Sequence, residues 1–121
     1  MPAREALGQV GLDGRAEVLA SNLSHGEHRQ LEIAMALATR PRMLLLDEPL
    51  AGMGSSESRR MVATLNELKR QLTIFLVEHD LQAVFALADR ITVLVGGRVI
   101  ASGPPGEIRA NAAVRTAYLG D

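Results

Sequence analysis

The sequence predicts an α/β layered domain whose parallel sheet is flanked by helices. Two short runs, Met43–Leu46 and Thr73–Val77, of which the second is apolar from Ile74 on, are typical of strands buried on both faces of a parallel sheet. Segments with helical spacing of apolar residues precede and follow each run. This alternation of strand and helix favours a parallel sheet with helices packed on it. A length of 121 residues suits a single domain.

The first forty residues predict helices. Residues 4–20 favour short helices that are interrupted at residues 11–14, where glycines begin and end the break. A longer helix is expected from Glu27 to about Thr39, and Pro41 ends it because proline cannot continue the hydrogen-bond ladder. The expected buried stripe of this helix has four apolar members: Leu31, Ala34, Met35 and Ala38.

A turn and a second helix are expected between the two strands. Pro49, Gly52 and Gly54 favour the turn, and Ser55 or Ser56 is placed to cap the helix. The expected buried stripe of the second helix again has four members: Met61, Leu65, Leu68 and Leu72.

The last forty residues predict a helix, a β-hairpin and closing helices. Asp80 is placed to cap a helix that carries Leu81, Val84, Phe85 and Ala88. Two short apolar runs joined by two glycines, residues 91–95 and 98–101, predict a hairpin. One or two helices should follow the break at residues 103–105 and end near Tyr118.

Composition excludes several classes of protein. The formal net charge of -1 gives no indication of a nucleic-acid partner or an acidic membrane surface. The absence of cysteine excludes disulfides, thiolate metal sites and a cysteine nucleophile. The apolar runs are far shorter than the roughly 20 residues that cross a bilayer, and the start has no stretch typical of a signal peptide. A cytosolic chain is therefore expected.

Two strand ends carry groups suited to phosphate chemistry. Asp47 and Glu48 follow the first strand, where one carboxylate could hold Mg²⁺ and its neighbour could polarise a water. His79 follows the second strand, where an imidazole could donate a hydrogen bond to a phosphate oxygen. Taken alone, an Asp-Glu-Pro sequence is more simply the end of a strand and the start of a turn. A lone histidine at a strand end is equally more often structural.

A third feature lies at the start of the first long helix. Ser24 and Glu27 match a capping box, which is a structural arrangement. The same helix end presents free N–H groups and a positive dipole, which bind phosphate, and Gly26 is expected to keep it sterically open. His25 and His28 suggest a metal site only weakly, because no third ligand stands at a suitable spacing.

Together and in this order, the motifs resemble the nucleotide-binding domains of ABC ATPases. Leu23–Glu27 is similar to the signature motif, which is usually Leu-Ser-Gly-Gly-Gln. Met43–Pro49 resembles the Walker B strand with its catalytic glutamate. Ala51–Gly54 resembles the D-loop, and His79 resembles the switch histidine. The resemblance covers essentially the whole chain and implies the C-terminal part of a P-loop NTPase domain with a C-terminal hairpin.

Finer details are similar to the ATP-binding subunits of branched-chain amino-acid importers. These details are Leu-Ser-His-Gly-Glu, the Glu48–Gly54 sequence and the Tyr118–Gly120 ending. Amide and urea importers share such features. Within residues 1–121, the resemblance places the end of the helical subdomain and the signature helix at 1–40. The Walker B, D-loop, switch-histidine and C-terminal regions are then at 41–121.

The resemblance also implies site residues, cofactors and partners. Two ATP-binding subunits would close head to tail, and ATP held by the partner would contact the signature residues Leu23, Ser24, His25, Gly26 and Glu27. Asp47 would position Mg, Glu48 would act on the attacking water, and His79 would bind the γ-phosphate. The further partners implied are membrane permease subunits and, indirectly, a substrate-binding protein, with no nucleic acid. The implied location is cytoplasmic, peripheral on the inner face of the cell membrane.

Two departures from the family pattern modify these expectations. Gly54 stands where the D-loop usually closes with Asp. The sequence also lacks Gly-x-x-x-x-Gly-Lys-[Ser/Thr], the phosphate-cradling Walker A motif, and its single lysine is Lys69. We therefore expect the chain to be the half without Walker A and to hydrolyse no ATP alone.

Two other functions remain open at this point. One is a non-catalytic module that pairs with a complete ATP-binding subunit. The other is an ABC ATPase outside transport, in DNA repair or translation, although the coiled-coil or basic insertions frequent there are not visible. Without the P-loop half, open sheet edges and apolar surface should make the isolated chain marginally stable or prone to association.

Overall fold

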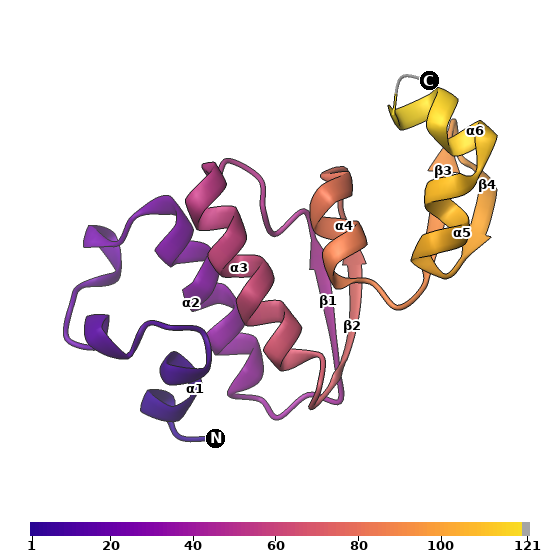
Figure 1. Cartoon of the computed structure of the whole chain (residues 1–121). Helices are drawn as coiled ribbons and strands as arrows, with labels where there is room; N and C mark the ends of the chain where they lie inside the picture. The colour runs from indigo at the N-terminus through magenta and orange to yellow at the C-terminus, as the bar shows by residue number, and fades with distance from the viewer. Residues whose placement is uncertain (120–121) are drawn as a thin grey trace. The chain divides into compact units, whose positions relative to one another are not determined.

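A computed structural model describes residues 1–119, which form two compact units. The first unit spans Met1–Asp80, and the second begins at Leu81 (Figure 1). The Gly120 of the expected C-terminal ending lies outside the described residues.

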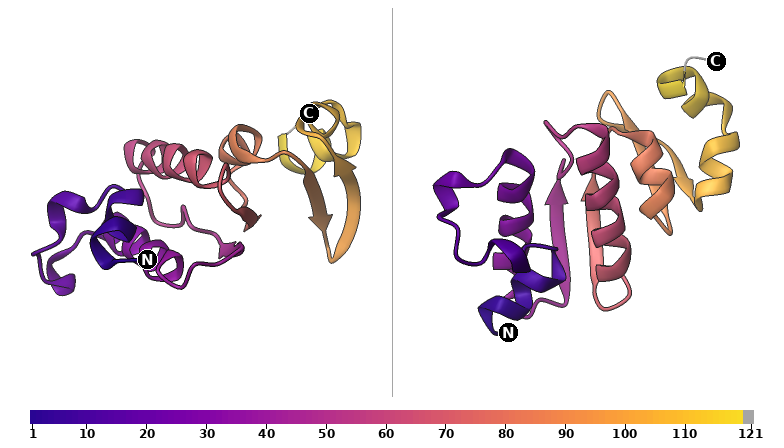
Figure 2. Two further views of the ribbon diagram at one scale, coloured as in Figure 1. Left: turned by 90° about the horizontal axis from the view of Figure 1, so that it is seen from below. Right: turned by 60° about the vertical axis from the view of Figure 1, so that its left-hand side comes forward.

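The first unit contains three α-helices and two parallel strands, with short 3₁₀ turns between the first two helices. Figure 2 shows α3 lying along one face of the strand pair. The elements in chain order are α1 (Ala3–Gln9), η1 (Asp13–Arg15), η2 (Ala20–Asn22), α2 (His25–Leu37), β1 (Met43–Asp47), α3 (Ser55–Leu68) and β2 (Thr73–Val77). The predicted α/β class and the parallel pairing are confirmed.

Helix α2 begins two residues earlier than predicted and buries a different stripe. Its buried apolar residues are Ile33, Ala34 and Leu37, whereas the predicted Met35 is 64% exposed. Of the predicted stripe, Ala34 is buried and Leu31 is half-buried, whereas the prediction was wrong at Met35 and Ala38, which are exposed. Since 3.6 residues make a turn, neighbouring stripes on an apolar helix are equally periodic, and packing against α1 and the rest of the unit selects one of them.

Helix α3 confirms the predicted stripe and corrects the predicted cap. Met61, Leu65 and Leu68 are buried, while Leu72 is half-buried beyond the end of the helix. The N-cap residue is Gly54, with no side-chain hydrogen bond to the first turn, so neither Ser55 nor Ser56 is the cap. The backbone turns into the helix at the extended Gly54, which places both serines inside the first turn.

The strand pair is buried on one face only, which corrects the expectation of burial on both. β1 and β2 pair in register from Met43 beside Thr73 to Asp47 beside Val77. Leu44 is 4% exposed, but its neighbour Leu45 is 73% exposed, because successive strand residues point to opposite faces and helices cover only one of them here. We call the uncovered residues the apolar sheet face: Met43, Leu45, Phe75 and Val77.

The second unit packs a helix and short C-terminal helices on a β-hairpin. Its elements are α4 (Leu81–Leu87), β3 (Ile91–Val95), β4 (Arg98–Gly103), α5 (Pro105–Ala110), α6 (Ala112–Val114) and a final helical turn (Arg115–Leu119). The hairpin is confirmed, and both turn glycines have positive φ, 56° at Gly96 and 79° at Gly97. The buried core of the unit consists of Ile91, Val93, Ile108 and Val114.

A hydrogen bond links the last helical turn to the hairpin, because the Tyr118 hydroxyl donates to the Leu94 carbonyl at 2.6 Å. Among the described residues, no helix has both the length and the apolar character needed to span a membrane.

Candidate functional site

The parallel register brings the two predicted strand ends to one edge of the sheet. Asp47, the last residue of β1, lies beside Val77, the last residue of β2. The pairing continues one step beyond the strand, because the Glu48 N–H donates to the Val77 carbonyl at 2.7 Å. Glu48 and the Glu78–His79 segment therefore meet at the same edge, as expected for a site at the carboxyl ends of parallel strands.

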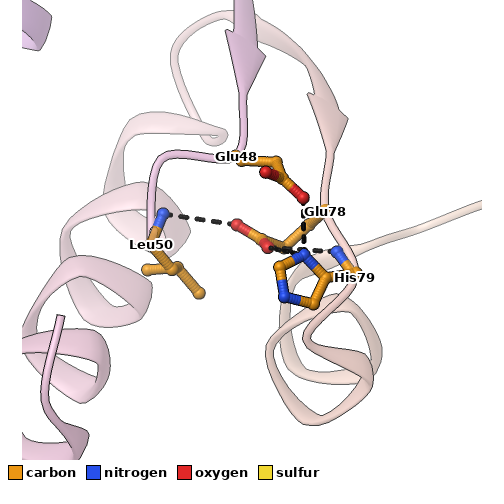
Figure 3. A network of polar contacts seen from close by, with 4 residues as sticks. All are labelled: Glu48, Leu50, Glu78 and His79. Carbon is orange, nitrogen blue, oxygen red and sulfur yellow. Dashed lines mark hydrogen bonds and ion pairs between the residues drawn. The ribbon is translucent and has the colours of Figure 1, made fainter. Parts of the chain in front are cut away.

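Glu48 and His79 are in direct contact. Nδ1 of His79 lies 2.5 Å from Oε1 of Glu48, and Figure 3 shows the two side chains pointing toward each other from different loops. Glu48 has a positive φ of 47°, which turns the chain sharply at the end of β1. The hydrogen bond that the His79 ring donates to the Glu48 carboxylate, together with the negative charge of that carboxylate, raises the pKa of His79 above the ordinary value of 6.5. Both side chains remain accessible, so a water or a phosphate oxygen can reach them.

Asp47 is exposed at the end of β1. By strand alternation, its side chain shares the uncovered face of the sheet with Leu45. The residue also lines a groove beside α2, together with Arg29 and Pro49. An accessible carboxylate next to Glu48 fits a hard cation such as Mg²⁺, which keeps several waters when bound by one or two carboxylates.

Sequence reasoning missed Glu78, which the structure adds to this edge. Its side chain is 1% exposed, and its two oxygens accept N–H groups from two loops, Leu50 at 3.3 Å and His79 at 3.0 Å (Figure 3). Potential ligand atoms of Glu48, Glu78 and His79 lie within 4.8 Å of one another, a group that includes neither His25 nor His28. A carboxylate next to the predicted histidine was visible in the sequence, but its burial was not.

The predicted capping box at the start of α2 is confirmed. The Ser24 hydroxyl accepts the Glu27 N–H at 3.2 Å, and Glu27 accepts the Ser24 N–H at 2.9 Å. That second bond lowers the pKa of Glu27, with a smaller contribution from Arg15, whose Nε lies 2.9 Å from the carboxylate. Ser24 is exposed, whereas Leu23 is half-buried. The tip of α2 is thus a capped helix start that faces solvent at Ser24.

Gly26 does not keep the helix end open as expected. It is buried, and a Cβ at this position would lie 1.9 Å from Oε2 of Glu57. The Glu57 carboxylate comes from the first turn of α3, and its acidic group lies where the α2 dipole favours an anion. Because the contact is made by the end of a flexible side chain, the cover over Gly26 is movable.

His25 reaches away from α2 to the turn after β1. Its Nε2 lies 3.0 Å from the Ala51 carbonyl oxygen, which only accepts, so Nε2 carries the proton of this bond. The ring also lies against Gly52, where a Cβ would be 2.8 Å from Nε2. Gly52 has a φ of 78°, so this position favours glycine for two reasons.

Two family models match different parts of the chain. Residues 2–51, which contain the α2 tip and the end of β1, match the family model described as ABC transporter. Residues 98–121 match a second model, described as branched-chain amino acid ATP-binding cassette transporter. This chain belongs to the ABC transporter ATP-binding family.

Curated relatives of this ABC family member include the ATP-binding proteins of two amino-acid transport systems and one iron-import system. The high-affinity branched-chain amino acid transport ATP-binding protein LivG of Salmonella typhimurium is 43% identical over 95% of this chain and 46% of its own length. The protein BraF of Pseudomonas aeruginosa, with the same description, is 40% identical over the same shares. The Fe(3+) ions import ATP-binding protein FbpC of Streptomyces avermitilis is 46% identical over 87% of this chain and 31% of its own length.

Solved ABC structures share the fold. An ATP-binding cassette of an ABC transporter in its ADP conformation superposes with a TM-score of 0.85 and 29% identity, covering 98% of this chain and 49% of that one. A Clostridium perfringens component of the cbiONQ ABC transporter complex gives 0.83 and 31%, covering 95% and 47%. The chain thus spans between 31% and 49% of the length of these relatives, and its fold is shared with solved ABC ATPase domains.

Proposed function

We propose that this chain provides the signature tip and the hydrolytic edge of an ATP-binding subunit in an ABC importer, for branched-chain amino acids. The observation that carries the proposal is the contact between Glu48 and His79 at the carboxyl edge of β1 and β2. An accessible carboxylate held beside an imidazole suits an attacking water and a terminal phosphate, because the carboxylate orients the water and the imidazole donates to phosphate oxygen.

Each site residue has a role in this proposal. Glu48 orients the attacking water, and His79 donates a hydrogen bond to the γ-phosphate. Asp47 holds Mg²⁺, whose charge would neutralise the phosphates when it is bound. These three residues act on nucleotide bound by the same subunit.

The α2 tip acts on nucleotide bound by the partner subunit. Leu23–Glu27 forms a helix start, and such ends present N–H groups and a positive dipole to anions. Ser24 is exposed there, so its hydroxyl is available to a γ-phosphate oxygen. Gly26 becomes accessible when the Glu57 side chain swings away, which a phosphate would favour by repelling that carboxylate.

ATP turnover in this proposal needs a P-loop from outside these 121 residues. The sequence contains no Gly-x-x-x-x-Gly-Lys-[Ser/Thr], whose amides and lysine cradle the phosphates. We infer that the isolated chain does not hydrolyse ATP at a measurable rate. The apolar sheet face is consistent with this inference, because a longer domain would cover it with further elements.

The proposed cargo rests on the C-terminal match rather than on overall identity. The iron-import relative is slightly more identical to this chain than LivG is, so identity across the cassette does not separate cargoes. The match of residues 98–121 to the branched-chain model favours amino acids. The corresponding partners are a second ATP-binding subunit, permease subunits at the inner face of the membrane and, through them, a substrate-binding protein.

A hybrid protein tests this function. The amino-terminal part of Salmonella LivG, up to the position that matches Met1, is joined to the 121 residues and expressed in a strain that lacks LivG. We expect the hybrid to restore uptake of labelled leucine and to hydrolyse ATP with Mg²⁺. Glu48→Gln in the hybrid should abolish both, whereas Glu67→Gln, an exposed carboxylate on α3, should leave both unchanged.

Two results would count against the proposal. The first is a folded hybrid that binds ATP but neither hydrolyses it nor supports uptake. The second is full activity of the Glu48→Gln hybrid. If the hybrid hydrolyses ATP but does not take up leucine, the proposed ATPase function would stand and the proposed cargo would be wrong.

A further inference from the structure

The turn between β1 and α3 is held from both sides by side chains of other segments. We call residues 48–54 the connecting turn. On one side, the Leu50 N–H donates to Oε2 of the buried Glu78 at 3.3 Å. On the other side, the carbonyl of the next residue, Ala51, accepts from Nε2 of His25 at 3.0 Å. Consecutive residues of the turn are therefore fixed to two different places in the first unit.

The two fixing residues belong to the two halves of the candidate site. His25 follows Ser24 at the tip of α2, and Glu78 precedes His79 at the end of β2. Glu78 also accepts the His79 N–H at 3.0 Å, so one buried carboxylate positions both the histidine loop and the connecting turn. Glu48 begins that turn and contacts His79 directly.

The sequence is locally adapted to the His25 contact. The ring of His25 lies so close to Gly52 that a Cβ there would be 2.8 Å from Nε2, and Gly52 has the positive φ that glycine tolerates best. Signature motifs usually have Gly at the position of His25, and glycine has no side chain to donate to Ala51. The contact is thus a feature of this chain's own residues.

We propose that His25 and Glu78 are positioning residues that hold the connecting turn from opposite sides and thereby couple the Ser24 tip to the Glu48–His79 pair within one chain. The coupling runs through two hydrogen bonds to consecutive residues, to the N–H of Leu50 and to the carbonyl of Ala51, so loss of one bond loosens the backbone that makes the other. The inference rests on contacts within residues 1–80 and does not depend on the proposed function.

Amide exchange and histidine NMR on the 121-residue chain test this coupling. Glu78→Gln keeps the shape of the side chain but leaves one acceptor oxygen in place of two. We expect about tenfold faster exchange of the Leu50 amide, the size of one lost hydrogen bond. We also expect a shift of the His25 ring nitrogens toward a mixture of tautomers, although His25 does not touch Glu78.

The second part of the test changes His25 at the tip of α2 and measures the effect on the Leu50 amide. His25→Ala should speed exchange of the Leu50 amide about threefold or more, and His25→Gln, whose amide can donate to Ala51, should restore slow exchange. The matched control is His28→Ala, an exposed histidine of the same helix. In the double variant the two effects should combine to less than their product, since they act on one element.

The exchange rate of the Glu27 amide distinguishes local loosening of the connecting turn from global unfolding. This amide donates a hydrogen bond to the Ser24 hydroxyl, and its exchange rate should stay unchanged if only the turn loosens. If the Glu78→Gln variant unfolds, the exchange rate of the Leu50 amide in His25→Ala is sufficient to test the proposal. The proposal is overturned if His25→Ala leaves Leu50 exchange unchanged, or if the folded Glu78→Gln variant leaves the His25 ring signals unchanged.

Discussion

Nδ1 of His79 lies 2.5 Å from Oε1 of Glu48, although the two residues are 31 positions apart in the sequence. The parallel register of β1 and β2 produces this contact, because it ends both strands at the same edge. Motif resemblance paired these residues in function, and the structure pairs them in space.

Glu48→Gln should lower the pKa of His79. The largest cause of the raised pKa is the hydrogen bond to the Glu48 carboxylate, and a neutral amide neither accepts as strongly nor attracts the imidazolium. An NMR titration of the ring signals in both chains measures the change. Glu67→Gln, an exposed carboxylate paired with Arg70 on α3, is the control and should leave the His79 titration in place. An unchanged midpoint in Glu48→Gln would contradict the contact.

The same contact predicts how stability depends on pH. Because the folded pKa of His79 is raised above 6.5, the stabilisation is fully present below pH 6.5 and is lost as the pH rises through the folded pKa. Urea unfolding at a series of pH values across this window should show a stability that falls toward alkaline pH. Glu48→Gln should flatten that slope. A steeper or reversed slope in the variant would show that another group governs this range.

Ser24→Ala should destabilise the first unit by about 1 kcal/mol, the typical cost of losing an N-cap side chain. The Ser24 hydroxyl accepts the Glu27 N–H, and alanine cannot. Urea unfolding followed by circular dichroism measures the loss. Ser24→Thr keeps the hydroxyl and should retain most of the stability, while Ser21→Ala, which lies outside α2 in the 3₁₀ turn η2, should have little effect. Equal stability of Ser24→Ala and the parent chain would show that the capping box contributes nothing.

Lysine on the apolar sheet face should reduce self-association. Leu45 and Phe75 are register partners on this uncovered face, which is 73% and 57% exposed at these two positions. The Leu45→Lys and Phe75→Lys double variant should shift sedimentation from oligomer toward monomer while keeping the helical content. Val99→Lys, at an exposed apolar position of the hairpin in the second unit, is the control. A parent chain that is monomeric at high concentration would contradict this account of the face.

The order of elements was predictable because each carries a strong local signal. Thr73–Val77 was predicted with the bounds that the structure gives, since a short run rich in β-branched and aromatic residues favours a strand. The Gly96–Gly97 hairpin was equally clear, because both residues need positive φ. These signals belong to the segment itself and do not depend on what packs around it.

Burial was less predictable because it depends on what covers each element. Met43–Leu46 was expected to be buried on both faces, yet Leu45 lies on the uncovered face. Gly26 was expected to be open, yet Glu57 covers it from a helix that begins about thirty residues later. Glu78 was overlooked for the same reason, because only the folded chain shows that its carboxylate is buried and accepts two backbone N–H groups.

The central claim, that the Ser24 tip contacts ATP held by another subunit, is tested most directly by sedimentation. The 121-residue chain is mixed with complete Salmonella LivG that carries glutamine at the position matching Glu48, with and without Mg-ATP. The account predicts a one-to-one complex that forms only with Mg-ATP and is lost in Ser24→Arg but kept in Ser21→Arg. Absence of any ATP-dependent complex, or an equally stable complex with Ser24→Arg, would contradict it.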